Sequence, residues 1–488
     1  MTLAVIAVYM AAVLGVGALS HRLFSGTGED YFLATRSIGP FVLLMSLFGT
    51  HMTAFALLGA SGESYRSGIG VFGLMASSSA LVVPAVFLFV GTRAWAVGKR
   101  FGYTTQAQYL RDRWGSDAFG LLMFAALVAL VIPYLLIGVL GAGLTLTDVT
   151  GGQVPTWVGG LVVSAVVMIY VTYGGLRGTA WANTFQTLVF MALGAATFIY
   201  VVNAMGGLGA TMLRLAAARP DLMVRGDNFT PIQYLTYAFI PLSAGAFPHL
   251  FMHWLTARKA SNFRVTVVAY PICIAIVWVP SVLLGVLGNL DFPALTVPES
   301  NSVMVRLIGF HAPALLAGLL GAGVFAAVMS SLDSQVLALG TMFTKDVVNH
   351  YGYDKKMSDR QQVMVGRLFV AAILVVAYLL SLVTRTTIFA MGTWSFTGFA
   401  GLFPIIVAAL CWRRSTKAGA FAALATVAVL WTYYFVQGWG LPDYTVGGTG
   451  VMPVAVVTLA SALAMIVVSL LSKPPEAAIV DKFFPAAR

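Results

Sequence analysis

Charged residues are scarce in this chain: Asp, Glu, Lys and Arg together make up 9% of its 488 residues, while 59% are hydrophobic. A soluble domain of this length needs more charge to cover its surface, so the composition excludes a soluble protein. Cysteine is also rare. Because Cys273 and Cys411 both fall within apolar stretches, we expect neither a disulfide nor a metal site from them. The composition therefore indicates a polytopic membrane protein.

Long apolar stretches make up most of the sequence. We count about thirteen that are long enough to span a bilayer, and the short joins leave no room for a separate soluble domain. No basic segment precedes the first stretch, so we expect it to remain in the protein rather than to be a cleaved signal peptide. The predicted spans are 2–20, 38–62, 69–95, 117–147, 155–173, 180–204, 232–256, 265–289, 312–343, 364–384, 388–411, 418–437 and 451–472.

The net charge of +11 is divided unevenly between the two sides of the predicted membrane. With about thirteen spans, about 22 of the 28 Lys and Arg residues lie on the side that holds the C-terminus. Positive loops face the cytoplasm, so we expect a plasma (inner) membrane protein with its N-terminus outside and its C-terminus in the cytoplasm. The charge thus needs no nucleic-acid partner. We expect a small-molecule solute and membrane lipid as partners, and no obligatory protein partner.

Two predicted spans contain residues that interrupt helices in mid-membrane. The second has Gly49 beside Thr50, and the seventh has Pro241 and Pro248. Transporters bind substrates where spans unwind, although Gly and Pro can also simply kink packed helices. Because each interrupted span begins a set of five, we predict an all-α fold with a five-plus-five inverted repeat whose first helices are broken. The predicted parts are an extra N-terminal helix (1–22), the first repeat (36–206), the second repeat (230–412), and two C-terminal helices with a short cytoplasmic tail (416–488).

A carboxylate lies in the middle of the ninth predicted span. No other charge follows Asp333 until Lys345, which at the helical rise is roughly 18 Å away and places Asp333 near mid-bilayer. A carboxylate there costs on the order of 3 kcal/mol, so residues of this kind usually have a function. We interpret Asp333 as part of an ion site.

Serines gather on one face of the same helix. Ala327, Ser330, Ser331 and Ser334 lie within an arc of about 100°, with Asp333 about 60° beyond Ser330. Sodium is a hard cation that binds hydroxyl, carbonyl and carboxylate oxygens, so serines that face a broken helix suit a weak sodium site. The alternative is small-residue helix packing, in which each hydroxyl bonds to a carbonyl one turn back.

Three segments of the chain resemble the sodium:solute symporter family: Asp30–Pro40, Tyr173–Gln186 and Ser330–Ser334. The resemblance runs from about Asp30 to at least Trp412, and it implies a LeuT-type inverted repeat with one extra helix in front. It also implies sodium as the coupling ion, with one or two ions per cycle. The ligands it implies for the first sodium site are the backbone carbonyls of Gly49, Met52 and Ala327 and the hydroxyls of Ser330 and Ser331.

The chain departs from the family pattern at a second sodium position that some relatives have. On the Tyr-Gly-Gly helix those relatives have an Asp where this chain has Asn183, and on the facing helix a hydroxyl where this chain has Asp333. One negative charge is thus kept but moved across the site. We predict a second cation site formed by Asn183, Ser330, Ser331, Asp333 and Ser334.

The sequence gives little information about the identity of the solute. Relatives that carry sugars have a Glu-Gln pair after the break, and Phe55 and Ala56 stand there instead, so we do not expect a sugar. His51 replaces a small polar group, Asn or Asp of relatives, and either contacts solute or is structural. A small solute with a carboxylate suits the lining best: a monocarboxylate, an amino acid or pantothenate. The predicted solute-binding residues are His51, Thr53, Ala56, Phe72, Met75, Tyr134 and Phe247, with Trp394 and Phe396 as candidate gates.

These features predict a secondary active symporter and not an enzyme, with sodium entry driving solute uptake by alternating access. Proton coupling is the alternative within this fold, because Asp333 and His51 could both titrate. A transporter-like membrane sensor is the other alternative, but about sixteen residues follow the last span, too few for a folded kinase domain.

Two further pairs of polar residues lie within predicted spans. His249 and His253 have a spacing that some metal sites use, but no third ligand is evident, so we do not expect a metal site there. Glu63 and Arg66 are three residues apart near the outer end of the second span, and we interpret them as a structural ion pair.

Overall fold

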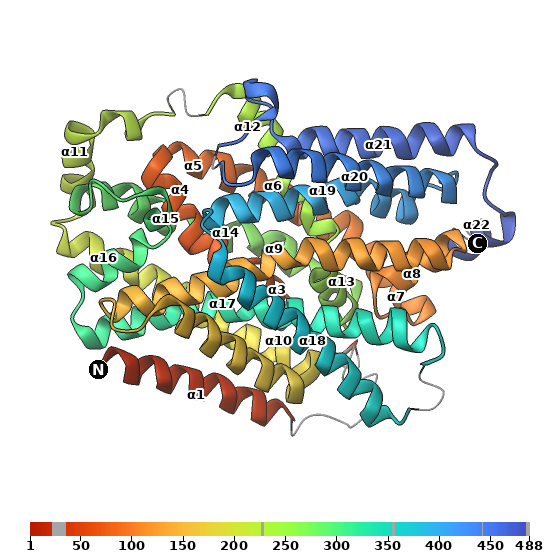
Figure 1. Cartoon of the computed structure of the whole chain (residues 1–488), viewed down its shortest axis with the longest axis horizontal. Helices are drawn as coiled ribbons and strands as arrows, with labels where there is room; N and C mark the ends of the chain where they lie inside the picture. The colour runs from red at the N-terminus through yellow and green to blue at the C-terminus, as the bar shows by residue number, and fades with distance from the viewer. Residues whose placement is uncertain (22–35, 226–228, 354–356, 442, 485–488) are drawn as a thin grey trace.

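The described part of the chain is almost entirely helical. The computed structural model describes residues 1–21, 36–225, 229–353, 357–441 and 443–484. Among these residues, β-structure is limited to one isolated bridge between Ile38 and Ala257. Most long helices run along the long axis of the molecule, so the N-terminus lies near one end and the C-terminus near the other (Figure 1). The predicted all-α class is confirmed.

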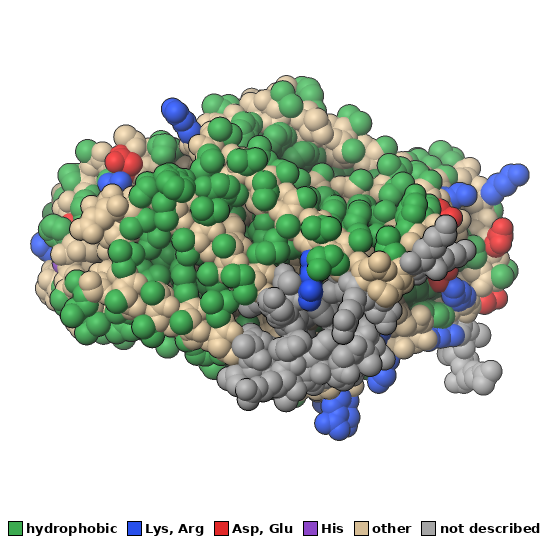
Figure 2. Space-filling model, turned by 60° about the horizontal axis from the view of Figure 1, so that its bottom comes forward, with side chains coloured by type: hydrophobic (Ala, Val, Ile, Leu, Met, Phe, Trp, Pro, Cys, Tyr) green, Lys and Arg blue, Asp and Glu red, His purple; other side chains and the backbone are tan. Residues whose placement is uncertain are grey.

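On the face shown in Figure 2, hydrophobic side chains cover most of the described middle region, while charged side chains lie mainly towards the ends. Exposed apolar residues come from many helices of the molecule and include Leu81, Val268, Leu368 and Leu463. A soluble monomer rarely exposes so much apolar surface, whereas a protein surrounded by lipid requires it.

Within the described residues, nine helical runs are long and apolar enough to cross a membrane, or eleven if each of two bent helix pairs counts as one span. Shorter apolar helices, Thr2–Val16 and Thr156–Ile169, occupy the places of the first and fifth predicted spans. The count of thirteen therefore stays a prediction. The nine runs are Gly70–Phe101, Asp117–Val149, Gly178–Ala204, Ala260–Asp291, Ala314–Asn349, Met364–Val383, Ile388–Cys411, Lys417–Gly438 and Pro453–Leu471.

The α-helices are α1 (Thr2–His21), α3 (Pro40–His51), α4 (Ala60–Ser67), α5 (Gly70–Phe72), α6 (Ser78–Val86), α7 (Thr92–Phe101), α8 (Gln106–Trp114), α9 (Asp117–Val149), α10 (Thr156–Ala204), α11 (Leu208–Ala218), α12 (Pro231–Tyr237), α13 (Pro248–Leu255), α14 (Phe263–Asp291), α15 (Val297–Ser300), α16 (Val303–His311), α17 (Ala314–Met342), α18 (Asp359–Val383), α19 (Ile388–Cys411), α20 (Lys417–Gly438), α21 (Pro453–Leu471) and α22 (Ala477–Phe483). Several are short and polar, which is why apolar stretches alone did not predict them.

Helix α10 cannot be straight. A straight helix of 49 residues would place its ends about 72 Å apart. Thr156, at its start, lies 3.0 Å from the Thr147 hydroxyl at the end of α9. Near its other end, the Tyr200 hydroxyl donates to the His311 carbonyl in α16 (3.4 Å), and α16 is ion-paired to the same end of α9. Helix α10 therefore folds back on itself, as two consecutive spans in this region require.

The first bent pair breaks at Met52. Helix α3 ends at His51, Met52 adopts an extended conformation (φ −84°, ψ 109°), and the helix that resumes at Phe55 is turned by 60°. The Thr53 hydroxyl accepts a hydrogen bond from the Phe55 N–H (2.9 Å), which caps the resumed helix. The interruption predicted around Gly49 is confirmed, three residues further along the chain.

The second bent pair breaks at Ala246 and Phe247. A 3-10 segment, η6 (Ile240–Gly245), follows α12, and the chain then turns by 50° into α13. Pro248 disfavours the helical conformation for the residue before it, and Phe247 is extended (φ −63°, ψ 123°). Proline is favourable as the first residue of the new helix because its missing N–H would have no partner there. The predicted break is confirmed, and Pro248 is its local cause.

Helix α17 forms the centre of the fold. Every residue from Leu320 to Met342 is buried, and the helix packs against α1, α3, α9, α10 and α13. Only a helix surrounded by protein can bury polar side chains at mid-membrane depth, because lipid offers them no partners. The fold thus surrounds the serines of α17 with polar groups from its neighbours.

Candidate functional site

The serines of α17 meet helix α3 directly before its break. The Ser330 hydroxyl donates to the carbonyls of Gly49 (2.9 Å) and Ala327 (3.0 Å). Three of the five predicted first-site ligands therefore converge on one point. Met52 is the first extended residue beyond α3. The Ser331 hydroxyl bonds instead to the Val328 carbonyl one turn back (3.0 Å), the geometry of the packing alternative.

Gly49 is needed for this close approach of helices. A Cβ at Gly49 would lie 2.0 Å from the Thr187 hydroxyl oxygen and 3.3 Å from the Asn183 carbonyl, both on α10. The Thr187 hydroxyl also donates to the Met45 carbonyl of α3 (2.9 Å). Helix α3 is thus held against α10 with its Gly49 carbonyl turned to α17. Carbonyl and hydroxyl oxygens in this arrangement are the donor set that a hard cation such as sodium prefers.

A second polar cluster lies one turn further along α17. The Asn183 amide donates to the hydroxyls of Thr50 (2.9 Å) and Ser334 (2.8 Å), which also contact each other. The Ser334 hydroxyl donates to the Asp333 carboxylate (3.0 Å). Of the predicted second-site residues, the structure brings together Asn183, Asp333 and Ser334, and it adds Thr50. Ser330 and Ser331 point elsewhere.

The Asn183 side-chain oxygen is buried and has no hydrogen-bond partner in the described part of the chain. The two ends of an amide are assigned from their surroundings, and a half-turn of the group exchanges them. After this half-turn the oxygen of Asn183 would face the hydroxyls of Thr50 and Ser334, next to the Asp333 carboxylate. The cluster would then present several oxygens and one negative charge, which fits a monovalent cation.

His253 is a polar residue of this cluster whose role the sequence did not reveal. Its Nδ1 lies 2.7 Å from the Ser46 hydroxyl, and its Nε2 lies 3.1 Å from Ser334 and 3.4 Å from Thr50. His253 is on α13, in the second broken span, so it joins that span to α3 and α17. The available signal was its position less than two helical turns after the break. Its spacing from His249 had suggested only a possible metal site.

An aromatic cluster fills the space between the two breaks. The Tyr134 hydroxyl donates to the His51 carbonyl (3.2 Å), which is left free where α3 ends, and His51 Nδ1 contacts the Tyr270 hydroxyl. The Tyr134 ring stacks on Phe247 (centroids 5.3 Å apart), and Phe396 packs edge-on against both. The structure thus brings together three predicted solute-binding residues and one candidate gate.

The remaining predicted solute and gate residues lie in different places. The Thr53 hydroxyl caps Phe55, and Ala56 is buried in the turn that follows. Met75 is buried and Phe72 half-buried on the next span, and among the described ring contacts Phe72 makes none with the aromatic cluster. Trp394 lines a cavity of about 30 Å³, which has room for only a few water molecules.

His249 is a second residue that the sequence analysis did not assign to the solute site. Its ring stacks on Phe247 (5.0 Å) and lies 5.6 Å from Tyr134. It is buried, and in the described structure neither ring nitrogen has a hydrogen-bond partner. It stands in the first turn of α13, where backbone N–H groups also have no acceptor within the helix. Polar groups that are buried without partners are costly, so they often serve a ligand.

The ion pair predicted near the outer end of the second span is present. Arg66 contacts the Glu63 carboxylate, which also accepts from the Ser67 hydroxyl (2.9 Å). A second ion pair joins Arg66 to Asp443 (3.5 Å), in the connection between α20 and α21. This network ties the resumed helix of the first bent pair to the C-terminal helices.

Comparisons with known proteins agree on one family. The family model for the sodium:solute symporter family matches residues 31–426. The high-affinity proline transporter PutP of Bacillus subtilis (strain 168) is 26% identical over 490 residues, covering 96% of this chain and 98% of its own length. The sodium/proline symporter of Escherichia coli (strain K12) is 26% identical over 519 residues, covering 98% of this chain and 95% of its own. The sodium/pantothenate symporter of the same organism is 25% identical over 440 residues, covering 87% of this chain and 88% of its own.

Solved structures agree on the fold. A sodium-coupled sialic acid symporter in a substrate-bound, outward-open state superposes with a TM-score of 0.78 at 18% identity, covering 97% of this chain and 98% of its own. The nucleobase-cation-symport-1 family transporter Mhp1, in a closed conformation, superposes with a TM-score of 0.60 at 14% identity, covering 92% and 97%. The LeuT-type arrangement expected from the sequence is confirmed.

Proposed function

Since the chain belongs to the sodium:solute symporter family, with sodium as its coupling ion, we propose that it takes up a small solute bearing a carboxylate. The observation that carries the proposed solute is the buried, unpartnered ring of His249 in the first turn of α13. The contact of Ser330 with the carbonyls of Gly49 and Ala327 supports a sodium site at the break of α3. A sodium ion there would be held by these three oxygens, with Met52 and Ser331 completing the shell after local rotation.

A second cation would occupy the cluster of Asn183, Thr50, Ser334 and Asp333. Two observations support this: the buried Asn183 oxygen that lacks a partner, and the Asp333 carboxylate one hydrogen bond from Ser334. The carboxylate would offset the ion's charge in a region that water does not reach. The transporter would then move two sodium ions with each solute.

The solute would bind between the breaks, against the rings of Tyr134 and Phe247. Its carboxylate would lie at the first turn of α13, where the N–H groups of His249 and Leu250 have no acceptor within the helix and the helix dipole is positive. The unpartnered ring of His249 would donate a further hydrogen bond. Proline, pantothenate and sialic acid, which appear in the names of the similar proteins, all carry a carboxylate.

The basic residues support an orientation of the protein in the membrane. Arg113 donates to the Arg413 carbonyl (3.5 Å), and Arg413 is ion-paired to Asp481 of α22 (3.3 Å), which lies at the end of the molecule opposite the N-terminus (Figure 1). We place this end in the cytoplasm and the N-terminus outside, as the positive-inside rule requires. Sodium would bind from the outside and hold α3 against α17, which favours solute binding, and both would leave at the cytoplasmic end.

Uptake by purified protein in liposomes tests the proposal. Labelled L-proline, pantothenate and sialic acid would be offered with an imposed sodium gradient and a potential set by valinomycin. We expect accumulation of one of them that needs sodium, and Ser330→Ala should raise the sodium concentration for half-maximal uptake about tenfold. Accumulation driven by a pH gradient without sodium would contradict the proposal and favour the proton-coupled alternative.

A further inference from the structure

The carbonyl of Ala246 loses its backbone partner at the second break. Ala246 and Phe247 both donate backward to the Ser243 carbonyl, while the first backbone bond of α13 that reaches the break runs from Phe251 to the Phe247 carbonyl (3.0 Å). Among the described backbone bonds none ends on the Ala246 carbonyl, which is buried in the protein. A buried carbonyl needs a donor from elsewhere.

Gln106 supplies that donor. Its side-chain amide lies 2.8 Å from the Ala246 carbonyl, and the glutamine is only 1% exposed. Gln106 is the first residue of α8, a short helix near the end opposite Met1 (Figure 1). The contact joins residues 140 positions apart, and it reaches the residue directly before Phe247, whose ring stacks on Tyr134 in the proposed solute site.

The start of α8 is held rigidly. Thr105 caps the helix by accepting from the Gln108 N–H (3.2 Å), and the Gln108 side chain accepts in return from the N–H groups of Thr104 and Thr105 (2.9 and 3.3 Å). Such a reciprocal capping box satisfies several free N–H groups of the first turn at once. The cap therefore fixes the backbone from which the Gln106 side chain extends.

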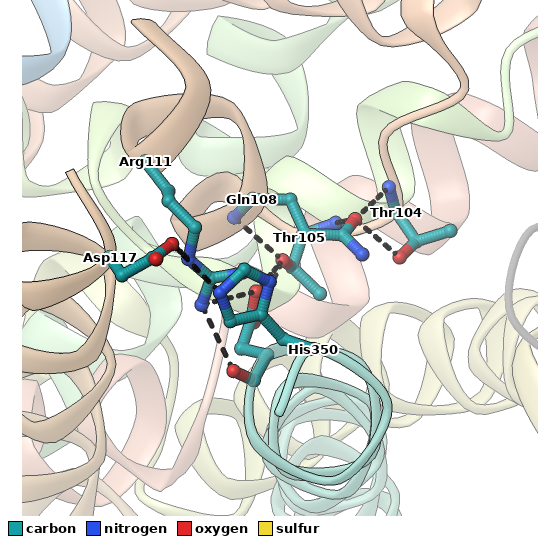
Figure 3. A network of polar contacts seen from close by, with 7 residues as sticks. Thr104, Thr105, Gln108, Arg111, Asp117 and His350 are labelled. Carbon is teal, nitrogen blue, oxygen red and sulfur yellow. Dashed lines mark hydrogen bonds and ion pairs between the residues drawn. The ribbon is translucent and has the colours of Figure 1, made fainter. Parts of the chain in front are cut away.

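The same cap binds the continuation of the serine helix. The Thr105 hydroxyl donates to the carboxylate of Asp346 (2.8 and 3.0 Å to its two oxygens), and Arg111 donates to the Asp346 carbonyl (2.9 Å). Asp346 follows α17 without a break in the helical run. Figure 3 shows this network, extended by Asp117 between Arg111 and His350. The first turn of α8 thus contacts both the second break and the helix that carries the sodium ligands.

We propose that Gln106 is a positioning residue for solute binding. By holding the Ala246 carbonyl it fixes the extended conformation of the break, and with it the place of the Phe247 ring and the first turn of α13. Thr105 beside it binds Asp346, so the same cap also anchors α8 to the helical run that continues α17. The inference rests on the proposed function, because it concerns the affinity for the transported solute.

The test compares two replacements of Gln106 with a matched control. Gln106→Met keeps the length of the side chain but cannot donate, and Gln106→Glu places a carboxylate against the carbonyl. At saturating sodium we expect the solute KM to rise about tenfold for Met and further for Glu, with the maximal rate changed less than about threefold. Asn262→Leu is the control, because Asn262 is also buried and its amide also donates to a backbone carbonyl, that of Ile38 (2.9 Å), away from both breaks; its KM should stay within about twofold of the wild type.

Each outcome decides between the claims. A wild type without sodium-driven uptake of L-proline, pantothenate or sialic acid overturns the proposed function, and this inference with it. Wild-type uptake with an unchanged KM in Gln106→Met overturns only the role of Gln106, as does an equal rise of KM in Asn262→Leu. If the Met and Glu variants do not reach the membrane, Gln106→Asn replaces them, because its side chain is one carbon shorter and draws the amide away from the Ala246 carbonyl. If the KM of Gln106→Asn is unchanged while its melting temperature falls as far as that of the control variant, the positioning role of Gln106 is also overturned.

Discussion

Moving the charge of Asp333 back to position 183 should preserve the second cation site, whereas deleting it should destroy the site. The structure puts the two positions side by side: Ser334 is bonded both to Asn183 (2.8 Å) and to Asp333 (3.0 Å). A carboxylate at either position lies one hydrogen bond from the same hydroxyl. We therefore compare Asp333→Asn with the double variant Asn183→Asp and Asp333→Ser.

The size of the effect follows from distance and dielectric. A cation bound at the Ser334 hydroxyl would lie about 4 Å from the Asp333 carboxylate, which at an effective dielectric constant of 20 is worth about 4 kcal/mol, or about a thousandfold in affinity. Asp333→Asn should thus leave the second site empty at ordinary sodium concentrations. The double variant restores a carboxylate at the same separation and should recover most of that affinity.

Ion stoichiometry is the quantity to measure. Each sodium contributes about 2.3 kcal/mol at 100 mV and about 1.4 kcal/mol for a tenfold gradient, together about 500-fold in solute accumulation. The potential at which net solute flux vanishes in liposomes should report two sodium ions for the wild type and the double variant, and one for Asp333→Asn. Asp443→Asn removes an exposed carboxylate and should leave the stoichiometry at two. An unchanged stoichiometry in Asp333→Asn would refute the second site.

Three further changes test other parts of the structure. Gly49→Ala would bring a methyl group 2.0 Å from the Thr187 hydroxyl oxygen, so it should cost about 1–3 kcal/mol and lower the melting temperature, with partial rescue by Thr187→Ala. His249→Phe keeps the stacked ring but removes both nitrogens, so the solute KM should rise about tenfold with little change in sodium dependence; equal KM values would remove His249 from the solute site. Phe483→Ala should speed amide hydrogen exchange in α22 far more than Lys482→Ala does. Phe483 is buried, whereas the ion pair of Lys482 is exposed and worth at most about 1 kcal/mol. Faster exchange in Lys482→Ala than in Phe483→Ala would contradict this reasoning.

The helix breaks could be predicted because their causes are local. Pro248 acts on the residue directly before it, and a glycine beside polar residues in mid-span marks where α3 approaches its end. The serine face of α17 was predictable for a similar reason, since helical periodicity alone places Ser330 and Ser334 on one side. These features depend on the sequence within a few residues of each site.

Contacts between distant segments could not be predicted from the sequence. The polar partners of His253 lie about 80 and 200 positions away, so its role depends on how the second broken span packs on the first. Helix α8 is short and polar, so no apolar stretch in the sequence predicts it. Gln106 acquires its partner, the Ala246 carbonyl, only when α8 packs against the second break. The pairing of Phe396 rather than Trp394 with Tyr134 likewise depends on the rotation of α19.

Helix α17 contacts both broken spans, and the helical run that continues it contacts the cap of α8. Ser330 reaches the first break through Gly49, Ser334 reaches the second broken span through His253, and Asp346 beyond it holds the cap of α8. Loss of a contact made by α17 should therefore change sodium and solute dependence together. Loss of a contact made only by α8 should change solute dependence with little effect on sodium. Ser330→Ala and Gln106→Met form such a pair, and a common pattern in the two variants would mean that α8 does not act separately on the solute site.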